Sequence, residues 1–125
     1  MPKKIDGAEI KILDQSLIKT TYSDNSIINA THLESMRSEY TKISGGEDMS
    51  QVRLLVVFEG GIEVSRDVGE RYLTERVRPK IGEALVAKNP ITAEYLKGAS
   101  AVMKTSHPVR FFSDEETAKD WLLSL

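Results

Sequence analysis

Two short apolar runs, each bounded by charged residues, constrain the fold of this chain more than any other feature of its sequence. The first run is 54–58 and the second is 84–87. A run this short and this apolar is typical of a β-strand that is buried on both faces. Such strands occur in parallel sheets that helices cover on both sides, so the two runs predict the centre of an α/β fold.

Amphipathic segments lie around both runs and predict helices. Apolar residues recur at helical spacing over 33–43, 68–81 and 91–103. Asn89 and Pro90 predict the start of the third helix, because asparagine caps helices and proline is tolerated in the first turn. The face of this helix that we expect to be buried consists of Ile91, Tyr95, Leu96, Ala99, Val102 and Met103.

Capping residues mark the starts of the first and the last predicted helix. The first helix has two candidate caps, Asn29 and Thr31. Before the last helix, Ser113 and Glu116 form a capping box, in which each side chain bonds a free backbone N–H group. An apolar stripe at helical spacing follows this box, and we expect it to pack on the sheet: Ala118, Trp121, Leu122 and Leu125.

Residues 8–22 predict an antiparallel hairpin, because Ile10 and Ile12 alternate with polar residues and a turn sequence follows them. A last strand is expected over 109–112. The predicted order is β-β-α-β-α-β-α-β-α, in a single domain that spans residues 1–125. We therefore expect an α/β fold with a mixed sheet, in which an N-terminal antiparallel hairpin joins three parallel strands.

The hairpin carries two adjacent apolar pairs, Ile12 with Leu13 and Leu17 with Ile18. Neighbouring residues of a strand point to opposite faces, so one member of each pair faces away from the core. Either a helix or a second copy of the chain must cover that face. We predict a homodimer, since two-fold association is the commonest closed arrangement of a soluble chain.

Few residues in the sequence could carry chemistry. There is no cysteine, which excludes disulfides, thiol nucleophiles and cysteine-bound zinc. His32 and His107 are the two histidines, and neither has a partner at the spacing of a metal-binding motif. We interpret both as ordinary surface residues. The sequence therefore predicts no metal site, no cofactor and no catalytic residue.

Charge and hydropathy exclude two further classes of partner. The 17 lysines and arginines against 19 aspartates and glutamates leave a net charge of −2, which gives no electrostatic reason to bind nucleic acid. No apolar run approaches the length of about 20 residues that a membrane-spanning helix needs, and no signal-peptide pattern is present. We expect a cytoplasmic protein that neither binds nucleic acid nor inserts into a membrane.

The order of the elements, together with residues 83–89 and 108–122, resembles the STAS-like (SpoIIAA-like) superfamily of the anti-sigma-factor antagonists and their uncharacterised bacterial relatives. In 108–122, as in those relatives, a short strand precedes a serine, acidic residues, an alanine and a Trp-Leu pair. The resemblance implies a STAS-like fold and a protein partner.

The same resemblance points to a regulatory serine. In the antagonists, a kinase phosphorylates a serine at the start of the helix that follows the central strand, and Ser65 lies at about that place here. The aspartate and glycine that surround the family's serine do not surround Ser65 in the family order. Ser65 is the candidate phosphosite, and the candidate interaction loop before it consists of Glu59, Gly60, Gly61 and Glu63.

Three functions are compatible with the sequence. The one we favour is a non-catalytic regulatory or protein-interaction module, in which case the chain is not an enzyme. The alternative is a carrier of a small apolar, lipid-like ligand, because the CRAL-TRIO fold is related to the STAS-like fold. A third hypothesis is an enzyme that uses Glu59 and Glu63, since paired carboxylates do acid–base work where burial raises the pKa of one of them.

Overall fold

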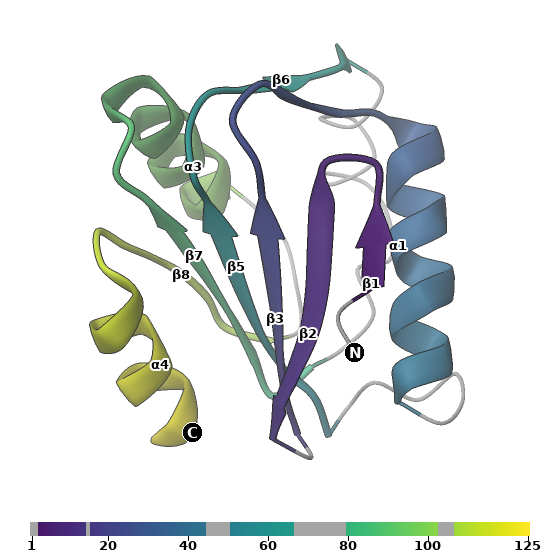
Figure 1. Cartoon of the computed structure of the whole chain (residues 1–125). Helices are drawn as coiled ribbons and strands as arrows, with labels where there is room; N and C mark the ends of the chain where they lie inside the picture. The colour runs from purple at the N-terminus through teal and green to yellow at the C-terminus, as the bar shows by residue number, and fades with distance from the viewer. Residues whose placement is uncertain (1–2, 15, 45–50, 67–79, 103–106) are drawn as a thin grey trace.

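The computed structural model describes residues 3–14, 16–44, 51–66, 80–102 and 107–125. Its centre is a six-stranded mixed sheet with the strand order β1-β2-β3-β5-β7-β8 (Figure 1). β1, β2 and β3 pair antiparallel, and β5, β7 and β8 continue the sheet parallel to β3. The strands are β1 (Lys3–Ile5), β2 (Ala8–Asp14), β3 (Leu17–Tyr22), β5 (Arg53–Phe58), β7 (Gly82–Ala87) and β8 (Val109–Phe112).

Helices cover both faces of this sheet. α1 (Ala30–Ile43) and α3 (Pro90–Val102) pack on one face, and α4 (Glu115–Leu123) packs on the other (Figure 1). A small parallel sheet of β4 (Ser26–Ile28) and β6 (Ile62–Val64) lies beyond the carboxyl ends of the central strands. None of the described helices combines the length and the apolar composition that a membrane crossing requires.

This architecture confirms the predicted α/β fold, with an N-terminal antiparallel hairpin followed by parallel strands. The sequence did not predict β1, β4 or β6, because each has three residues and is too short to show an alternating pattern. The helix that we predicted over 68–81 lies mostly outside the described residues.

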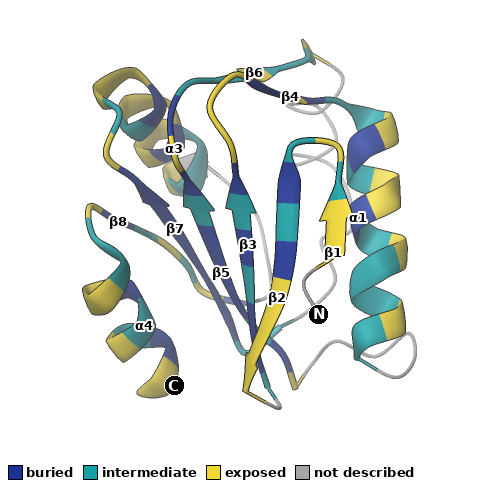
Figure 2. Cartoon of the chain, in the orientation of Figure 1, coloured by how far each residue is buried: buried dark blue, intermediate teal, exposed yellow. Residues whose placement is uncertain are grey.

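β5 and β7 form the centre of the core, as the two apolar runs predicted. Every residue of β7 is buried, and within β5 only Arg53 and Val57 are partly exposed (Figure 2). Successive side chains enter two separate clusters. Leu54 belongs to the cluster that includes residues of α1 and α3, whereas Leu55 belongs to the cluster that includes residues of α4.

The structure decides which residues cap the helices. Of the two candidates for α1, Asn29 is the cap, and its side-chain oxygen accepts the N–H of His32 at 2.8 Å. The predicted cap of α4 is wrong: Asp114, and not Ser113, accepts the N–H of Thr117, at 3.1 Å. A carboxylate at this position satisfies a free N–H group and also carries the charge that the positive end of the helix favours.

The buried face of α3 matches the predicted one only in part: Leu96 is buried as predicted and Ala99 is partly buried, while Met103 lies outside the described residues. Thr92 and Leu96 are buried, whereas Ile91 is 83% exposed and Tyr95 is 45% exposed. The Thr92 hydroxyl donates a buried hydrogen bond of 2.9 Å to the carbonyl oxygen of Gly60. This bond fixes the rotation of the helix about its axis. A pattern of apolar residues cannot indicate such a bond, because both of its partners are polar groups.

The chain itself covers both faces of the N-terminal hairpin. Leu17 packs in the cluster with α4, and Ile18 packs in the cluster with α1. Ile12 and Leu13 are exposed, at the end of β2 that β1 does not reach (Figure 2). The homodimer stays a prediction, and Ile12 and Leu13, not Leu17, are the apolar residues that a second copy could contact there.

Polar contacts hold α4 against the sheet at both of its ends. The two carboxylate oxygens of Glu115 accept hydrogen bonds from the ammonium group of Lys19, at 2.9 and 3.0 Å. At the other end, Arg53 Nε donates to the carbonyl oxygen of Leu122 at 2.8 Å, and Nη2 donates to that of Leu125 at 2.9 Å. The position of α4 is therefore set by charge as well as by burial.

The apolar stripe of α4 packs on the sheet over most of its length, as predicted. Ala118 and Leu122 are fully buried, and Trp121 is partly buried with its ring centre 5.4 Å from that of Phe112. Leu125, the last residue of the predicted stripe, is 42% exposed. The second cluster therefore rests mainly on Ala118 and Leu122.

Truncating Leu122 tests this assignment. Leu122→Ala should lower the free energy of unfolding by about 2–5 kcal/mol, because it leaves a cavity in the core. Leu123 is 52% exposed, so Leu123→Ala is the matched control and should change the stability by about 0.5 kcal/mol or less. Urea denaturation gives both values. Equal losses of stability in the two variants would contradict the assignment of Leu122 to the buried face of α4.

Candidate functional site

Hydrogen bonds join the loop after β3 to the loop after β5, at the carboxyl ends of the parallel strands, where ligands of α/β sheets usually bind. Asp24 Oδ1 accepts the N–H of Gly61 at 2.7 Å, and the N–H of Asn25 donates to the carbonyl oxygen of Gly61 at 2.8 Å. Thr92 of α3 holds the carbonyl of Gly60. A Cβ atom on Gly60 would lie 2.2 Å from Asp24 Oδ1, so the close approach requires glycine.

This loop contains the candidate interaction residues. Gly60 is buried, whereas Glu59 and Glu63 are exposed on either side of the glycine pair. General acid–base catalysis by a glutamate usually relies on a buried carboxyl, and both of these side chains are exposed. The two carboxylates therefore face solvent from a backbone that hydrogen bonds hold in place.

Ser65 follows β6 and directly precedes a helical residue, Arg66. Its N–H donates to the carbonyl oxygen of Ile28 at 2.9 Å, which joins it to the small β4–β6 sheet. Its side chain is partly exposed. The residues after Arg66 that would form the expected helix lie outside the described residues.

Both histidines are buried, so the prediction that they are ordinary surface residues is wrong. His32 is 2% exposed and His107 is 4% exposed. Each contacts a carboxylate, Asp6 in one case and Glu83 in the other, that lies 26 or 24 residues away in the sequence. Partners at such separations have no motif spacing, which is why the sequence did not reveal them.

His32 connects three elements through its imidazole ring. Nδ1 lies 2.9 Å from Asp6 Oδ2 in the β1–β2 turn, and Nε2 lies 2.8 Å from the hydroxyl of Tyr22 in β3. Burial, with smaller contributions from the charges of Glu83 and Asp6, raises the pKa of Tyr22 far above its usual range. The phenol therefore stays neutral and its hydroxyl bonds Nε2, while Nδ1–H donates to the Asp6 carboxylate, which can only accept.

Because both ring nitrogens are engaged and the ring is buried, His32 fastens α1 to the sheet and is not exposed to a ligand as a base. The dipeptide Asp6-Gly7 could have revealed this part of the site. Asp-Gly is among the strongest short signals for a two-residue hairpin turn, and here it joins β1 to β2. Asp6 has a φ of 53°, a conformation that aspartate tolerates better than most residues.

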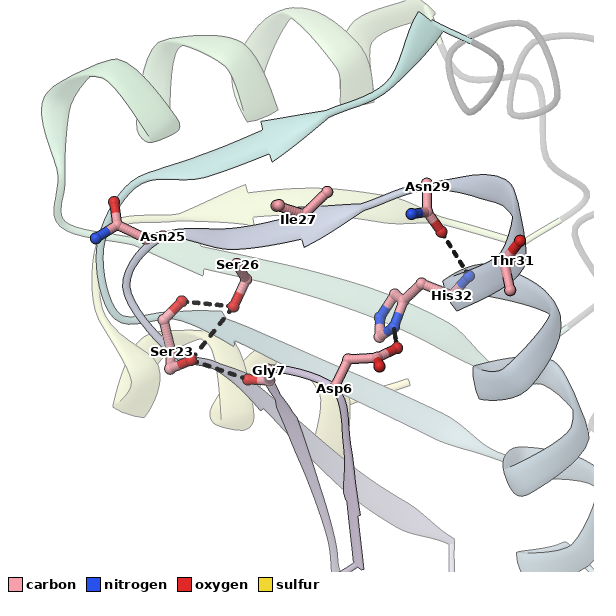
Figure 3. Close-up of a pocket in the computed structure, with 9 residues that line it drawn as sticks. All are labelled: Asp6, Gly7, Ser23, Asn25, Ser26, Ile27, Asn29, Thr31 and His32. Atoms are coloured by element: carbon pink, nitrogen blue, oxygen red, sulfur yellow. Dashed lines mark hydrogen bonds and ion pairs between the residues drawn. The ribbon is translucent and has the colours of Figure 1, made fainter.

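An open cavity of about 440 Å³ lies beside this histidine (Figure 3). Its walls come from the β1–β2 turn, the loop between β3 and β4, β4 itself, and the first turn of α1. Hydrogen bonds fix these walls. Ser23 donates to the carbonyl oxygen of Gly7, and Ser26 donates to that of Ser23. Of the polar residues that line the cavity, the sequence indicated only Asn29 and Thr31, as candidate helix caps, and His32.

A second buried polar cluster lies at the amino end of β7. Glu83 Oε1 is 3.3 Å from His107 Nε2 and 3.8 Å from Lys80 Nζ. Burial by itself would raise the pKa of the Glu83 carboxyl. The hydrogen bond with His107 and the positive charge of Lys80 outweigh burial and hold the pKa of Glu83 below its usual range. Within the described part of the chain, no three acidic or histidine side chains cluster closely enough to hold a metal ion.

Comparison with known proteins bears out the STAS-like resemblance at the level of the fold. No protein-family model matches the chain, and no curated protein matches it. A solved structure does: an uncharacterised protein of the DUF3478 family from Shewanella loihica PV-4, described as having a SpoIIAA-like fold. The two chains share 15% sequence identity with a TM-score of 0.57, and the match covers 98% of each. The chain therefore has a SpoIIAA-like fold.

The Glu83 cluster generates a pH-dependence prediction. A carboxyl whose pKa is lower in the folded state stabilises that state fully above its unfolded pKa, here 4.5, and loses this contribution as the pH falls through the lower folded value. We expect the free energy of unfolding to fall on acidification below about pH 4.5, and Glu83→Gln to remove part of that dependence.

Urea denaturation between neutral and acidic pH measures this effect. Glu94 is exposed, so Glu94→Gln is the control and should follow the wild type at every pH. If the curves of stability against pH for Glu83→Gln and the wild type ran parallel, Glu83 would not be charged in the folded protein.

Proposed function

We propose that this chain is a non-catalytic protein-interaction module that binds its partner through the loop between β5 and β6. One observation carries the proposal. Hydrogen bonds with Asp24, Asn25 and Thr92 fix this loop, while Glu59 at its start and Glu63 in β6, just after it, stay exposed. A surface that is rigid before binding loses little conformational entropy when a partner docks.

Exposed apolar side chains flank the two glutamates. Ile27 is the register partner of Glu63 in the small sheet and is 56% exposed. Ile91 precedes the threonine that holds Gly60 and is 83% exposed. Apolar side chains beside charged ones are typical of a protein-binding surface. We call Ile27, Glu59, Glu63 and Ile91 the loop surface, and its chemistry suits a partner with basic and apolar groups.

Ser65 would regulate this surface in our proposal. It follows β6, the strand that carries Glu63. A phosphate there would add between one and two negative charges, by the usual ionisation of phosphoserine. Added negative charge beside Glu59 and Glu63 would change how strongly a basic partner binds. The STAS-like fold supports this idea by analogy, since anti-sigma-factor antagonists are regulated at a serine in a similar place.

The alternative, a carrier of a lipid-like ligand, draws no support from the cavity beside His32. Polar side chains line most of that cavity, and Ile27 is its one large apolar residue. A carrier of this kind needs a mainly apolar pocket. The cytoplasmic location stays a prediction.

Binding assays with variants of the loop surface test the proposal. The tagged chain would capture proteins from its host cells, and each captured protein would then be purified and titrated against the chain. Glu63→Arg and Ile91→Asp should each weaken the binding of a true partner about tenfold or more, because both lie in the loop surface.

Glu116 is exposed on α4, on the other face of the sheet, so Glu116→Arg is the matched control and should bind like the wild type. Thermal melts would verify that all variants fold. A partner whose affinity is the same for all three variants binds elsewhere, and that result would overturn the proposed surface.

A further inference from the structure

Two tight turns form part of the wall of the cavity beside His32. Asp6 and Asn25 are the two residues other than glycine with positive φ among the described residues, and both line it. Aspartate and asparagine tolerate this conformation in turns, so the turns set the shape of the wall. The volume of about 440 Å³ is within the range of small-molecule sites.

The walls of this cavity are held in place before any ligand enters. Asp6 is fixed through His32, which in turn is fixed by Tyr22. The hydroxyl of Ser23 bonds the carbonyl oxygen of Gly7 from the facing turn. Figure 3 shows the lining residues around one opening, with His32 and Asp6 on one side and Ser23 on the other. Fixed polar groups lose little freedom when they bind a ligand.

Several polar groups at the cavity keep bonding capacity after these internal bonds are made. Asp6 uses Oδ2 for His32, which leaves Oδ1 as an acceptor. Asn29 uses its side-chain oxygen for the N–H of His32, which leaves its NH₂ group as a donor. The Thr31 hydroxyl both donates and accepts. Donors and acceptors are therefore mixed within one small opening.

The charge of the lining narrows the class of ligand. Its residues include one carboxylate, Asp6, and neither a lysine nor an arginine, so an anionic ligand would meet repulsion without compensation. An amine would satisfy Asp6 but would offer nothing to the NH₂ group of Asn29. Hydroxyl groups satisfy both, because each one donates and accepts.

From this combination we infer that the cavity between the β1–β2 turn and the start of α1 binds a small neutral molecule with neighbouring hydroxyl groups, such as a sugar or a polyol. This site shares Ile27 with the loop surface but differs from it in its other residues, and it goes beyond the proposed interaction function. The hydroxyls would bond Asp6, Asn29 and Thr31, and Ile27 would contact the apolar edge of the ligand.

Titrations followed by NMR spectroscopy of the ¹⁵N-labelled chain test the inference. The probes are D-glucose, D-ribose, myo-inositol and methyl α-D-glucoside, the last showing whether a sugar linked to a larger molecule also fits. At least one probe should produce saturable shifts of the amide signals of Gly7, Ser23 and His32. Putrescine and inorganic phosphate, titrated in parallel, represent the amine and the anion.

Two conservative variants make the test specific. Asp6→Asn keeps an acceptor for His32 but replaces the free acceptor with a donor, and Thr31→Val removes a hydroxyl at constant shape. Each should weaken binding roughly fivefold, as the loss of one hydrogen bond does. Two controls lie away from the cavity: Asp120→Asn on α4 and Thr21→Val on the face of β3 that α4 covers. Both should bind like the wild type.

Three results would overturn the inference. The first is the absence of saturable shifts with every hydroxylated probe up to tens of millimolar. The second is saturation by putrescine or phosphate alone. The third is equal affinity in Asp6→Asn, Thr31→Val and the two controls, which would place the bound probe elsewhere.

Discussion

The burial of β5 and β7 on both faces is the constraint on which the rest of this structure depends. These strands expose almost no side chain, so helices must cover the sheet from both sides. α1 and α3 provide one cover, and α4 provides the other. The crossovers through α1 and α3 therefore return over one face of the sheet, which places the loops that precede these helices at the strand ends.

At those strand ends, hydrogen bonds rather than apolar contacts hold the loops in place. The loop after β5 is held by a carboxylate from the loop after β3 and by a hydroxyl from α3. The turn between β1 and β2 is held to α1 through His32. Both sets of bonds are made within the chain, and they leave other groups of the same regions facing solvent. Fixed, exposed polar groups are what recognition of a partner or of a small molecule requires.

The two buried histidines show how this protein pairs polar groups in its interior. Each ring lies against a carboxylate, and Glu83 also has Lys80 nearby. The buried carboxylate of Glu83 would cost several kcal/mol without such partners. The pairs are thus compatible with a tightly packed sheet, and they connect elements that the apolar contacts alone would leave free to rotate.

The sequence by itself determined the α/β class, the order of the principal strands and the pairing of antiparallel with parallel segments, because these depend on apolar spacing over short stretches. It also identified Asn89 as a cap and reduced the cap of α1 to Asn29 or Thr31, since a cap acts on residues two or three positions away. Tertiary structure alone decided the rotation of α3, which follows from the bond between Thr92 and Gly60, and the burial of His32 by Asp6 and Tyr22. These bonds join residues from 10 to 32 positions apart, and only the folded chain brings such residues within reach of each other.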